Sequence, residues 1–571
     1  MLLHSILIYS WPVALIKDLE RWMRNFIWSG DVNKRKLVSV AWHKVCSPQK
    51  EGGLGIRDLS KINEAANLKL CWELNQSQLQ WAQFLKDKVI KNKKPIRYHV
   101  FSSIWSSIKH KYFEVMDNGA WKIGNGESIN FWTDTWCGDP LIQTLNIPHD
   151  LHDDLNSNVS NMISNSKWNI PGCILQAYPP LRHLTETISL PIIQKDDQFI
   201  WKHSHDGSLS FKDAYLFHCP VGQNIHWAKL IWNSSIPPSK SLTIWRALHD
   251  KLPTDDNLSK RGCHLPSICN LCGKEVETSV HLFFQCIFAK FIWSWLSSTI
   301  NVQCSFLSFH EALALYNRNW SPLCKLTILA TIINCCNVIW FCRNQRRFSE
   351  KLIHPKSAIN LIISATSLSG NLCKLHATSS ITDFTILKAF KVLLRPPNAP
   401  KIIEVIWQPP IFNWIKCNID GASIGNLGIS SCGGIFRNSN FDFLGAFASN
   451  LGLNNSLNAE LTGAMFAIEI AYQKNWRYLW IEPDSMLVTL AFKSSKLVPW
   501  HLQNRWDNCI HVISSMDFMV THIYREGNHC ADKLANIGLS SQSFTWWDQM
   551  PTQIGGDFTR NRLGLPYFRF C

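Results

Sequence analysis

Four carboxylates in the last third of the chain stand where a predicted strand ends or a predicted helix begins. Asp420 and Asp484 each end a strand, whereas Glu460 and Asp532 lie in the first turns of helices. Strand ends and helix N-termini that share one sheet edge can converge in space. Acids held so close repel one another unless cations neutralise them, and carboxylate oxygens suit Mg²⁺ or Mn²⁺. Two such ions about 4 Å apart can clamp an in-line phosphoryl displacement.

Each of these acids also has a purely structural interpretation. Glu460 and Asp532 could stabilise helix N-termini through the helix dipole. Asp420 with Gly421 could form an ordinary turn, and Asp484 could cap the helix that follows it. For any single acid the structural interpretation is preferred. All four on one order of strands and helices favour a metal site.

A second group of side chains has the spacing of a zinc site. Cys269, Cys272, His281 and Cys286 form the pattern Cys-x2-Cys-x8-His-x4-Cys. They would fill all four positions of a tetrahedral Zn²⁺ ion, so this zinc would be structural. The alternative is a set of buried thiols and a surface histidine, which are common in a chain with 20 cysteines. Two nearby residues could replace one of the ligands: Cys263 and His264.

The elements that must position the acids form an α/β pattern. Residues 415–420 alternate between apolar and polar side chains, as a half-buried strand does. Strands over 432–437 and 441–448 follow, separated by a short polar turn that signals a hairpin. An apolar stripe over 461–472 predicts a helix. The sequence predicts two more strands, over 478–481 and 518–524, and a closing helix that begins at Asn528 as its N-cap. Together these elements predict a five-stranded mixed sheet with helices.

This segment resembles the type-1 ribonuclease H domain in the form carried by plant LINE-type (non-LTR) retroelements. The resemblance covers about residues 412–540, and each of its four motifs holds one acid in the family's order: 414–422, 458–461, 481–485 and 524–535. It implies cleavage of the RNA strand of an RNA–DNA hybrid by two metal ions, leaving a 5′-phosphate and a 3′-hydroxyl. Specificity would come from the RNA 2′-hydroxyl and the shape of the minor groove.

The resemblance also implies a role for each acid. Asp420 would bridge both ions, Asp484 would bind the ion on the nucleophile side, and Asp532 would bind the other. Glu460 would bind a metal and sense the 2′-hydroxyl. Cellular members place a mobile histidine in a longer loop before the last acid; the loop is short here, and Arg525 is the first candidate for that assisting role. His522 and His529 are the two other candidates. His529 is better explained as a solvent-facing residue at the start of a helix.

The region over residues 205–295 resembles the zinc-binding domain that follows plant LINE-type reverse transcriptases. Segments 211–215, 227–232 and 271–286 carry most of this similarity, which implies nucleic-acid binding rather than chemistry. Its tryptophans fit helix packing better than base stacking. Segments farther upstream resemble the region after the polymerase core: 42–48, 52–58 and 126–136. An aromatic-x-Asp-Asp hairpin is not found in the sequence, so we expect no DNA synthesis.

The charge of the chain is unevenly distributed. The 571 residues carry a formal net charge of +15, which makes a polyanionic partner plausible. Residues 411–540 hold 9 Lys+Arg and 10 Asp+Glu, so this domain is about neutral. The stretch between Asp484 and the fifth predicted strand also looks too short for the basic handle helix of some cellular members of the family that it resembles. Residues 1–130 hold 20 Lys+Arg and 11 Asp+Glu. The densest basic run, 86–97, is either a phosphate-contacting patch or a solvated helix end and loop.

Composition and length bound the remaining possibilities. A chain this long with 46% hydrophobic residues predicts two to four domains. Residues 1–16 predict a buried helix rather than a signal peptide, and no stretch is identified as a membrane span. The cysteines are too dilute for a disulfide scaffold, which favours an intracellular location without distinguishing nucleus from cytoplasm.

The predicted order is a basic helical remnant of the reverse transcriptase, a connecting region, the zinc-binding domain, a helical region with a Pro-rich linker, the ribonuclease H domain and a tail: 1–140, 141–204, 205–295, 296–411, 412–540 and 541–571. The function expected is an RNA–DNA hybrid ribonuclease with Mg²⁺ and structural Zn²⁺, in a truncated retroelement protein. The alternative is an inactive remnant that only binds nucleic acid. Protein partners and oligomeric state stay open.

Overall fold

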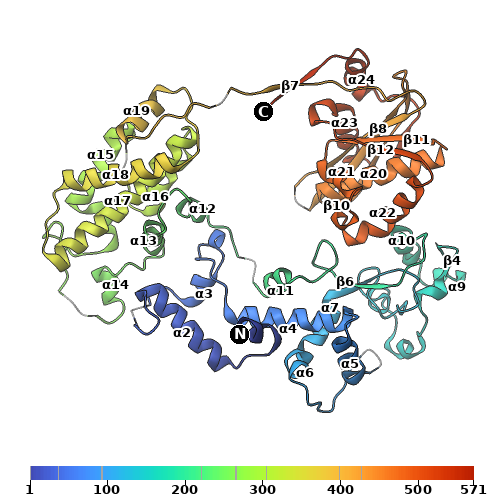
Figure 1. Cartoon of the computed structure of the whole chain (residues 1–571), viewed down its shortest axis with the longest axis horizontal. Helices are drawn as coiled ribbons and strands as arrows, with labels where there is room; N and C mark the ends of the chain where they lie inside the picture. The colour runs from blue at the N-terminus through green and yellow to red at the C-terminus, as the bar shows by residue number, and fades with distance from the viewer. Residues whose placement is uncertain are drawn as a thin grey trace. The chain divides into compact units, whose positions relative to one another are not determined.

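A computed structural model describes residues 2–35, 38–91, 94–219, 222–263, 266–303, 305–397, 399–425 and 427–571. The chain forms two compact units (Figure 1). The first unit comprises Met1–Glu64 and Phe217–Ala399, and the second comprises Ala65–Leu216 and Pro400–Cys571. Each unit therefore joins segments that lie far apart in the sequence. Two helices cross the division between the units: α4 (Leu59–Gln76) and α11 (Phe211–Phe217).

The first unit is a helical body built around α17 (Pro322–Ser349). Ser321 caps α17 by accepting a hydrogen bond from the Cys324 amide, and Pro322 follows at the first helical position, where its missing N–H costs nothing. The other helices of this unit are α1 (Leu2–Ile8), α2 (Val13–Ser29), α3 (Trp42–Cys46), α12 (Ala228–Ile231), α13 (Pro238–Leu248), α14 (Asp255–Ser259), α15 (Ile287–Ile300), α16 (Phe309–Ala314), α18 (Pro355–Leu372) and α19 (Ile381–Ala389).

Two expectations about apolar helices change with the structure. Helix α17 is long and apolar enough to cross a membrane by length and composition, although no stretch of the sequence was expected to do so. Of its most apolar window, 83% is buried inside the first unit, which is the burial of a core helix. The buried helix predicted over 1–16 is instead divided in two, since α1 ends at Ile8 and α2 begins at Val13. Helix α2 leaves Val13 and Phe26 largely exposed.

The second unit contains a six-stranded mixed sheet with the order β12-β11-β8-β9-β10-β13. Strands β8 to β10 form an antiparallel meander, while β11 and β12 run parallel to β8. The sheet has six strands rather than the five predicted, because β13 adds one from the segment expected to be a tail. The bounds are β8 (Ile415–Ser423), β9 (Gly428–Arg437), β10 (Phe443–Asn454), β11 (Tyr478–Pro483), β12 (Asp517–Val520) and β13 (Thr545–Trp547).

Alternating side chains divide this sheet into two buried faces. Cys417, Ile419 and Phe436 pack on one side with the helices between β10 and β12. Ile435 and Ala446 pack on the other side with the last two helices. The helices of this domain, visible in orange and red in Figure 1, are α20 (Ser456–Gln473), α21 (Met486–Ala491), α22 (Trp500–Ile513), α23 (His529–Gly538) and α24 (Gly555–Arg562).

The predicted linker and tail both belong to this domain. Strand β7 (Ile402–Val405) pairs with β14 (Tyr567–Phe570), although one segment precedes the domain's other elements in sequence and the other follows them. Trp407, within the predicted linker, is only 2% exposed. A proline-rich composition therefore did not mean a solvated connection, because the tryptophan and β7 bury apolar surface against the sheet.

Residues 119–201, largely predicted to be a connecting region, also enclose a core. Strand β3 (Gly119–Lys122) pairs with β6 (Gln198–Trp201). The chain segment between these two strands has a hydrophobic core of its own, which includes Phe131, Trp132 and Trp136. Periodicity is absent because short turns and helices carry this core. The remaining elements of the second unit are α5 (Gln80–Val89), β1 (Ile90–Lys91), β2 (Lys94–Pro95), α6 (Ser103–Ile108), α7 (Tyr112–Asn118), α8 (Leu141–Thr144), β4 (Ile163–Ser164), β5 (Lys167–Trp168), α9 (Gly172–Ala177) and α10 (Pro180–Thr187).

This small core packs against α22 of the sheet domain through hydrogen bonds. The Asn504 side-chain amide donates to the carbonyl oxygens of Ile123 at 2.9 Å and Ser189 at 3.2 Å. Lys195 forms an ion pair with Asp507 at 2.9 Å. The second unit is therefore one body, in which residues 119–201 brace a helix of the α/β domain.

Candidate active site and zinc centre

Three of the four predicted acids converge at one end of the sheet. Asp420 lies in β8, Asp484 follows β11 directly, and Glu460 lies near the start of α20. One carboxylate oxygen from each of the three lies within 4.8 Å of the others. Gly421 permits this approach, because a Cβ there would lie 2.3 Å from the backbone nitrogen of Glu460. The strand can therefore pass directly against the helix that carries the second acid.

Burial and mutual repulsion hold these acids toward their neutral forms. They raise the pKa of Asp420 to about 8, with Asp484 and Asp532 as the repelling neighbours. Burial first, and then Asp420, raises the pKa of Glu460. The Oε2 atom of Glu460 is buried and has no hydrogen-bond partner among the described residues. Converging carboxylates with an unpartnered buried oxygen fit a divalent cation, which would satisfy that oxygen and remove the repulsion.

The fourth acid, Asp532, lines the same cavity of about 470 Å³ but stands apart from the cluster of three. Its Oδ1 accepts a hydrogen bond from Arg525 at 3.0 Å, and its Oδ2 accepts one from Asn536 at 3.2 Å. The guanidinium of Arg525 is mostly exposed and also helps to counter the burial that raises the pKa of Asp484. Asp532 is thus held at the rim of the cavity, where Arg525 neutralises part of its charge.

The two histidines considered for the assisting role lie elsewhere. The His522 ring contacts the backbone carbonyl of Asp484 at 3.0 Å, and the His529 ring packs against Tyr567 with 4.8 Å between centroids. Within the described chain, the cavity lining includes Arg525 and neither histidine. The geometry therefore favours Arg525 among the three candidates.

Asn528 occupies the position before α23, as expected, but does not cap the helix. Its side chain makes no capping hydrogen bond; its amide donates to the carbonyl of Ile419 at 2.8 Å. Asn528 also bonds the carboxylate of Asp484, which lowers the pKa of that acid against the effect of burial. The residue therefore ties α23 to β8, one position before Asp420, a role that no local pattern in the sequence signals.

A buried polar network on the same face of β8 and β11 was also not predicted. Lys416 pairs with Glu482 at 2.7 Å, and the Asn418 amide donates to the same carboxylate at 3.0 Å. The Asn418 oxygen accepts from Arg437 at 2.6 Å and from Trp407 at 2.7 Å. Since side chains two apart share a face of a strand, this network lies in line with Asp420 and Asp484 and fixes the two strands that carry them.

The predicted zinc ligands also come together, within the first unit. Donor atoms of Cys269, Cys272, His281 and Cys286 all lie within 4.8 Å of one another. The two sulfurs of Cys269 and Cys286 are 3.8 Å apart, and the Cys272 sulfur is 3.4 Å from His281 Nε2. The hydrogen bond between these two sulfurs lowers the pKa of the Cys286 thiol and raises that of the Cys269 thiol. Three sulfurs and one imidazole nitrogen are a donor set that suits Zn²⁺.

The two alternative ligands are not part of this cluster. Cys263 is exposed and is absent from the group of four donors. His264 lies outside the described residues.

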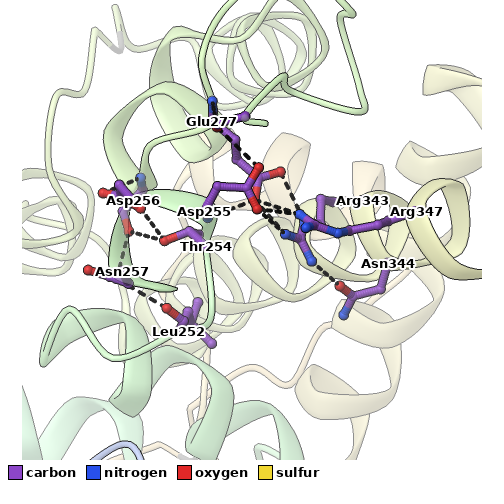
Figure 2. Close-up of polar contacts among 11 residues, drawn as sticks. Leu252, Thr254, Asp255, Asp256, Asn257, Glu277, Arg343, Asn344 and Arg347 are labelled. Atoms are coloured by element: carbon purple, nitrogen blue, oxygen red, sulfur yellow. Dashed lines mark hydrogen bonds and ion pairs between the residues drawn. The ribbon is translucent and has the colours of Figure 1, made fainter. Parts of the chain in front are cut away.

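A buried ion-pair cluster anchors the segment between the two pairs of zinc ligands (Figure 2). Glu277 is fully buried and receives two hydrogen bonds from Arg343 of α17, from Nε at 3.0 Å and from Nη2 at 2.5 Å. Arg347 pairs with Asp255 of α14 at 2.5 Å, and Asp255 lies 3.7 Å from Arg343. Two arginines thus balance two carboxylates, and they join the zinc loop and α14 to the core helix.

Comparisons with known proteins cover both sites. The family described as zinc-binding in reverse transcriptase matches residues 209–293, and the family described as reverse transcriptase-like matches residues 418–538. An Arabidopsis thaliana protein named "Putative ribonuclease H protein" is 25% identical over 98% of this chain and 90% of its own length. An "Uncharacterized mitochondrial protein" of the same plant is 34% identical over 22% of this chain and 84% of its own length.

Solved structures also match the C-terminal region. Ribonuclease H1 of Halobacterium salinarum is 23% identical, covers 22% of this chain and 96% of its own, and has a TM-score of 0.20. The ribonuclease H1 called LC11, solved with an RNA/DNA hybrid, is 20% identical over the same shares, with a TM-score of 0.21. The matches to the two families and to the plant relatives confirm the resemblance found in the sequence. The chain thus contains one region that matches the zinc-binding family of reverse transcriptases, followed by one that matches the reverse transcriptase-like family.

Proposed function

We propose that this protein cleaves the RNA strand of RNA–DNA hybrids, with Asp420, Glu460, Asp484 and Asp532 as the ligands of two Mg²⁺ ions. The observation that carries the proposal is the convergence of three carboxylates, of which Asp420 and Glu460 are buried, together with a buried oxygen of Glu460 that has no partner among the described residues. Such an arrangement destabilises a metal-free fold and is typical of a site built for cations. The cavity beside it also reaches Asp532 and Arg525.

The side chains of this site have distinct proposed roles. Bound divalent ions would activate a water and stabilise charge on the scissile phosphate. Asp420, central to the cluster, would hold both ions, while Asp484 and Asp532 would each hold one. Glu460 would contact the RNA 2′-hydroxyl in addition to a metal, and so distinguish RNA from DNA. Arg525, exposed at the cavity rim, would orient Asp532 and help the product phosphate to leave.

The zinc centre has a structural role in this proposal. Cys269, Cys272, His281 and Cys286 would fill all four positions of the ion, which leaves none for a substrate. The proposed protein works inside the cell, where the dilute cysteines stay reduced.

A hybrid-cleavage assay tests the proposed activity. The full chain is incubated with Mg²⁺ and an RNA–DNA hybrid labelled on the RNA strand. Asp420→Asn should abolish cleavage, whereas Asp517→Asn, at an exposed acid on the edge strand β12, should leave it unchanged. Cleavage by the wild type no greater than that by Asp420→Asn would refute the proposal and favour an inactive, nucleic-acid-binding remnant.

A further inference from the structure

An exposed aromatic cluster lies on the second unit, outside both matched domains. Phe84 of α5 is 71% exposed, and Phe101, before α6, is 93% exposed. Together with Trp81 and His99 they line a cavity of about 730 Å³. Phe101 and His99 form an edge-to-face pair with 4.8 Å between ring centroids. Two exposed phenylalanine rings that line one cavity offer an apolar surface that another molecule can cover.

The chain segment that carries these rings is rich in positive charge. Residues 80–110 contain seven Lys or Arg side chains and a single acid, a net charge of +6. Lys88 lies in the cavity wall with its Nζ 6.0 Å from the Phe84 ring centroid. Lys91 and Lys94 face each other across the short β1–β2 hairpin, and both are exposed, as is Arg97. Apolar rings within a basic field fit a ligand that is both flat and anionic.

Unpaired nucleic acid has that chemistry along its whole length. Each base offers an apolar face that stacks on an aromatic ring, and each phosphate offers one negative charge to a lysine or arginine. A duplex hides the faces of its bases and would use the charges alone. A neutral apolar partner would use the rings and gain nothing from the lysines. The combination of rings and charges therefore selects a single strand.

We propose that the surface formed by Phe84, Lys88, Lys94, Arg97 and Phe101 binds single-stranded nucleic acid. Bases stack on Phe84 and Phe101, and the lysines and arginine contact the adjoining phosphates. This site is independent of the proposed cleavage chemistry, because binding of a single strand needs no hydrolysis. It would supply the positive charge that the nearly neutral catalytic domain lacks.

Fluorescence anisotropy of the full-length chain with labelled 12-nucleotide strands tests the site. The double variant Phe84→Ala, Phe101→Ala should weaken binding about 30-fold or more, because the loss of one stacked base costs about 5-fold or more and this variant loses two. The double variant Phe84→Tyr, Phe101→Tyr keeps both rings and should bind as the wild type does. Phe384→Ala is the matched control: Phe384 is also exposed on a helix, with Lys388 Nζ 5.9 Å from its ring, but it lies in the first unit.

Salt dependence separates the contribution of the rings from that of the charges. Lys88→Ala with Lys94→Ala should reduce the slope of log affinity against log salt by about 0.7 for each phosphate that the variant no longer neutralises. The ring variant should weaken binding at every salt concentration and leave this slope unchanged. RNA and DNA strands are compared to identify the nucleic acid that the site takes. Circular dichroism verifies that each variant is folded, which these exposed positions should allow.

Two results would overturn the proposal. The first is equal affinity of the wild type, the Phe84→Ala, Phe101→Ala variant and the Phe384→Ala control for both strands. The second is binding of a duplex of the same length as tightly as a single strand, without loss in the ring variant. Neither result bears on cleavage, so the proposed nuclease stands or falls separately.

Discussion

Replacing Arg343 by methionine tests whether the buried ion pairs and the zinc centre form one cooperative structure. Arg343 makes two hydrogen bonds to Glu277, a fully buried carboxylate between the ligands Cys272 and His281. Methionine fills much of the space but leaves the carboxylates of Glu277 and Asp255 with Arg347 alone. Removing one partner of a buried pair typically costs about 3–5 kcal/mol, because the remaining charge stays uncompensated.

The magnitude of the effect on zinc follows from that cost. If docking of the zinc loop on α17 and binding of zinc occur as one event, the full cost appears in the zinc affinity, which falls by roughly two to four orders of magnitude. Competition with a coloured zinc chelator measures the affinity directly. The wild type should retain one zinc per chain at chelator concentrations that strip the Arg343→Met protein.

Matched variants isolate the charge effect. Arg346 lies on the same helix but is exposed, so Arg346→Met should retain zinc as the wild type does. Adding Glu277→Gln to Arg343→Met removes the unpaired charge and should restore much of the affinity, as expected for a coupled pair. Equal zinc retention by Arg343→Met and Arg346→Met would refute the coupling. A wild type without zinc would instead refute the zinc site itself.

Three further variants test the second unit. The pKa of Asp420 is raised to about 8 in the folded protein, whereas that of an unfolded Asp is about 3.9. The metal-free fold therefore loses stability as the pH rises from about 4 to about 8. Asp420→Asn should raise the denaturant midpoint above that of the wild type at pH 8 and change it far less at pH 5. Asn418→Ala leaves two buried donors without their acceptor and should destabilise the domain by about 2–3 kcal/mol in thermal or denaturant unfolding; an unchanged midpoint would contradict the network. Asn504→Ala removes the bonds to two backbone carbonyls and should make residues 119–201 more sensitive to limited proteolysis, whereas the exposed His511→Ala should not; equal digestion of both would argue against this interface.

Local patterns in the sequence were sufficient for much of the catalytic domain. Strand alternation over 415–420 and the apolar stripe over 461–472 correspond to β8 and α20, because both are set by which side chains face a core. Two of the four acids lie where the sequence predicted them: Asp484 directly follows β11, and Asp532 is in the first turn of α23. The other two were placed less accurately, since Asp420 lies within β8 and Glu460 lies beyond the first turn of α20. The structure then brings Asp420, Glu460 and Asp484 together, while Asp532 lies at the rim.

Other features carried no local signal. The sixth strand, β13, has only three residues. Strand β7 precedes the sheet in sequence and pairs with β14, which follows it at the end of the chain. Residues 119–201 enclose a core without any helical or strand period. Such segments are ordered by partners distant in the sequence, so their own composition resembled that of a linker, a connection and a tail.

The sequence by itself determined the chemistry that is available: four acids in one order, and three cysteines and a histidine at zinc spacing. Only the tertiary structure decided how those groups are held. Asn528 turns from capping its helix to bonding the Ile419 carbonyl, and Glu277 finds Arg343 at 66 residues' separation. The physical reason is that a motif fixes residue types over a few positions of the chain. A buried polar group, by contrast, must take whatever partner the folded core brings within hydrogen-bond distance.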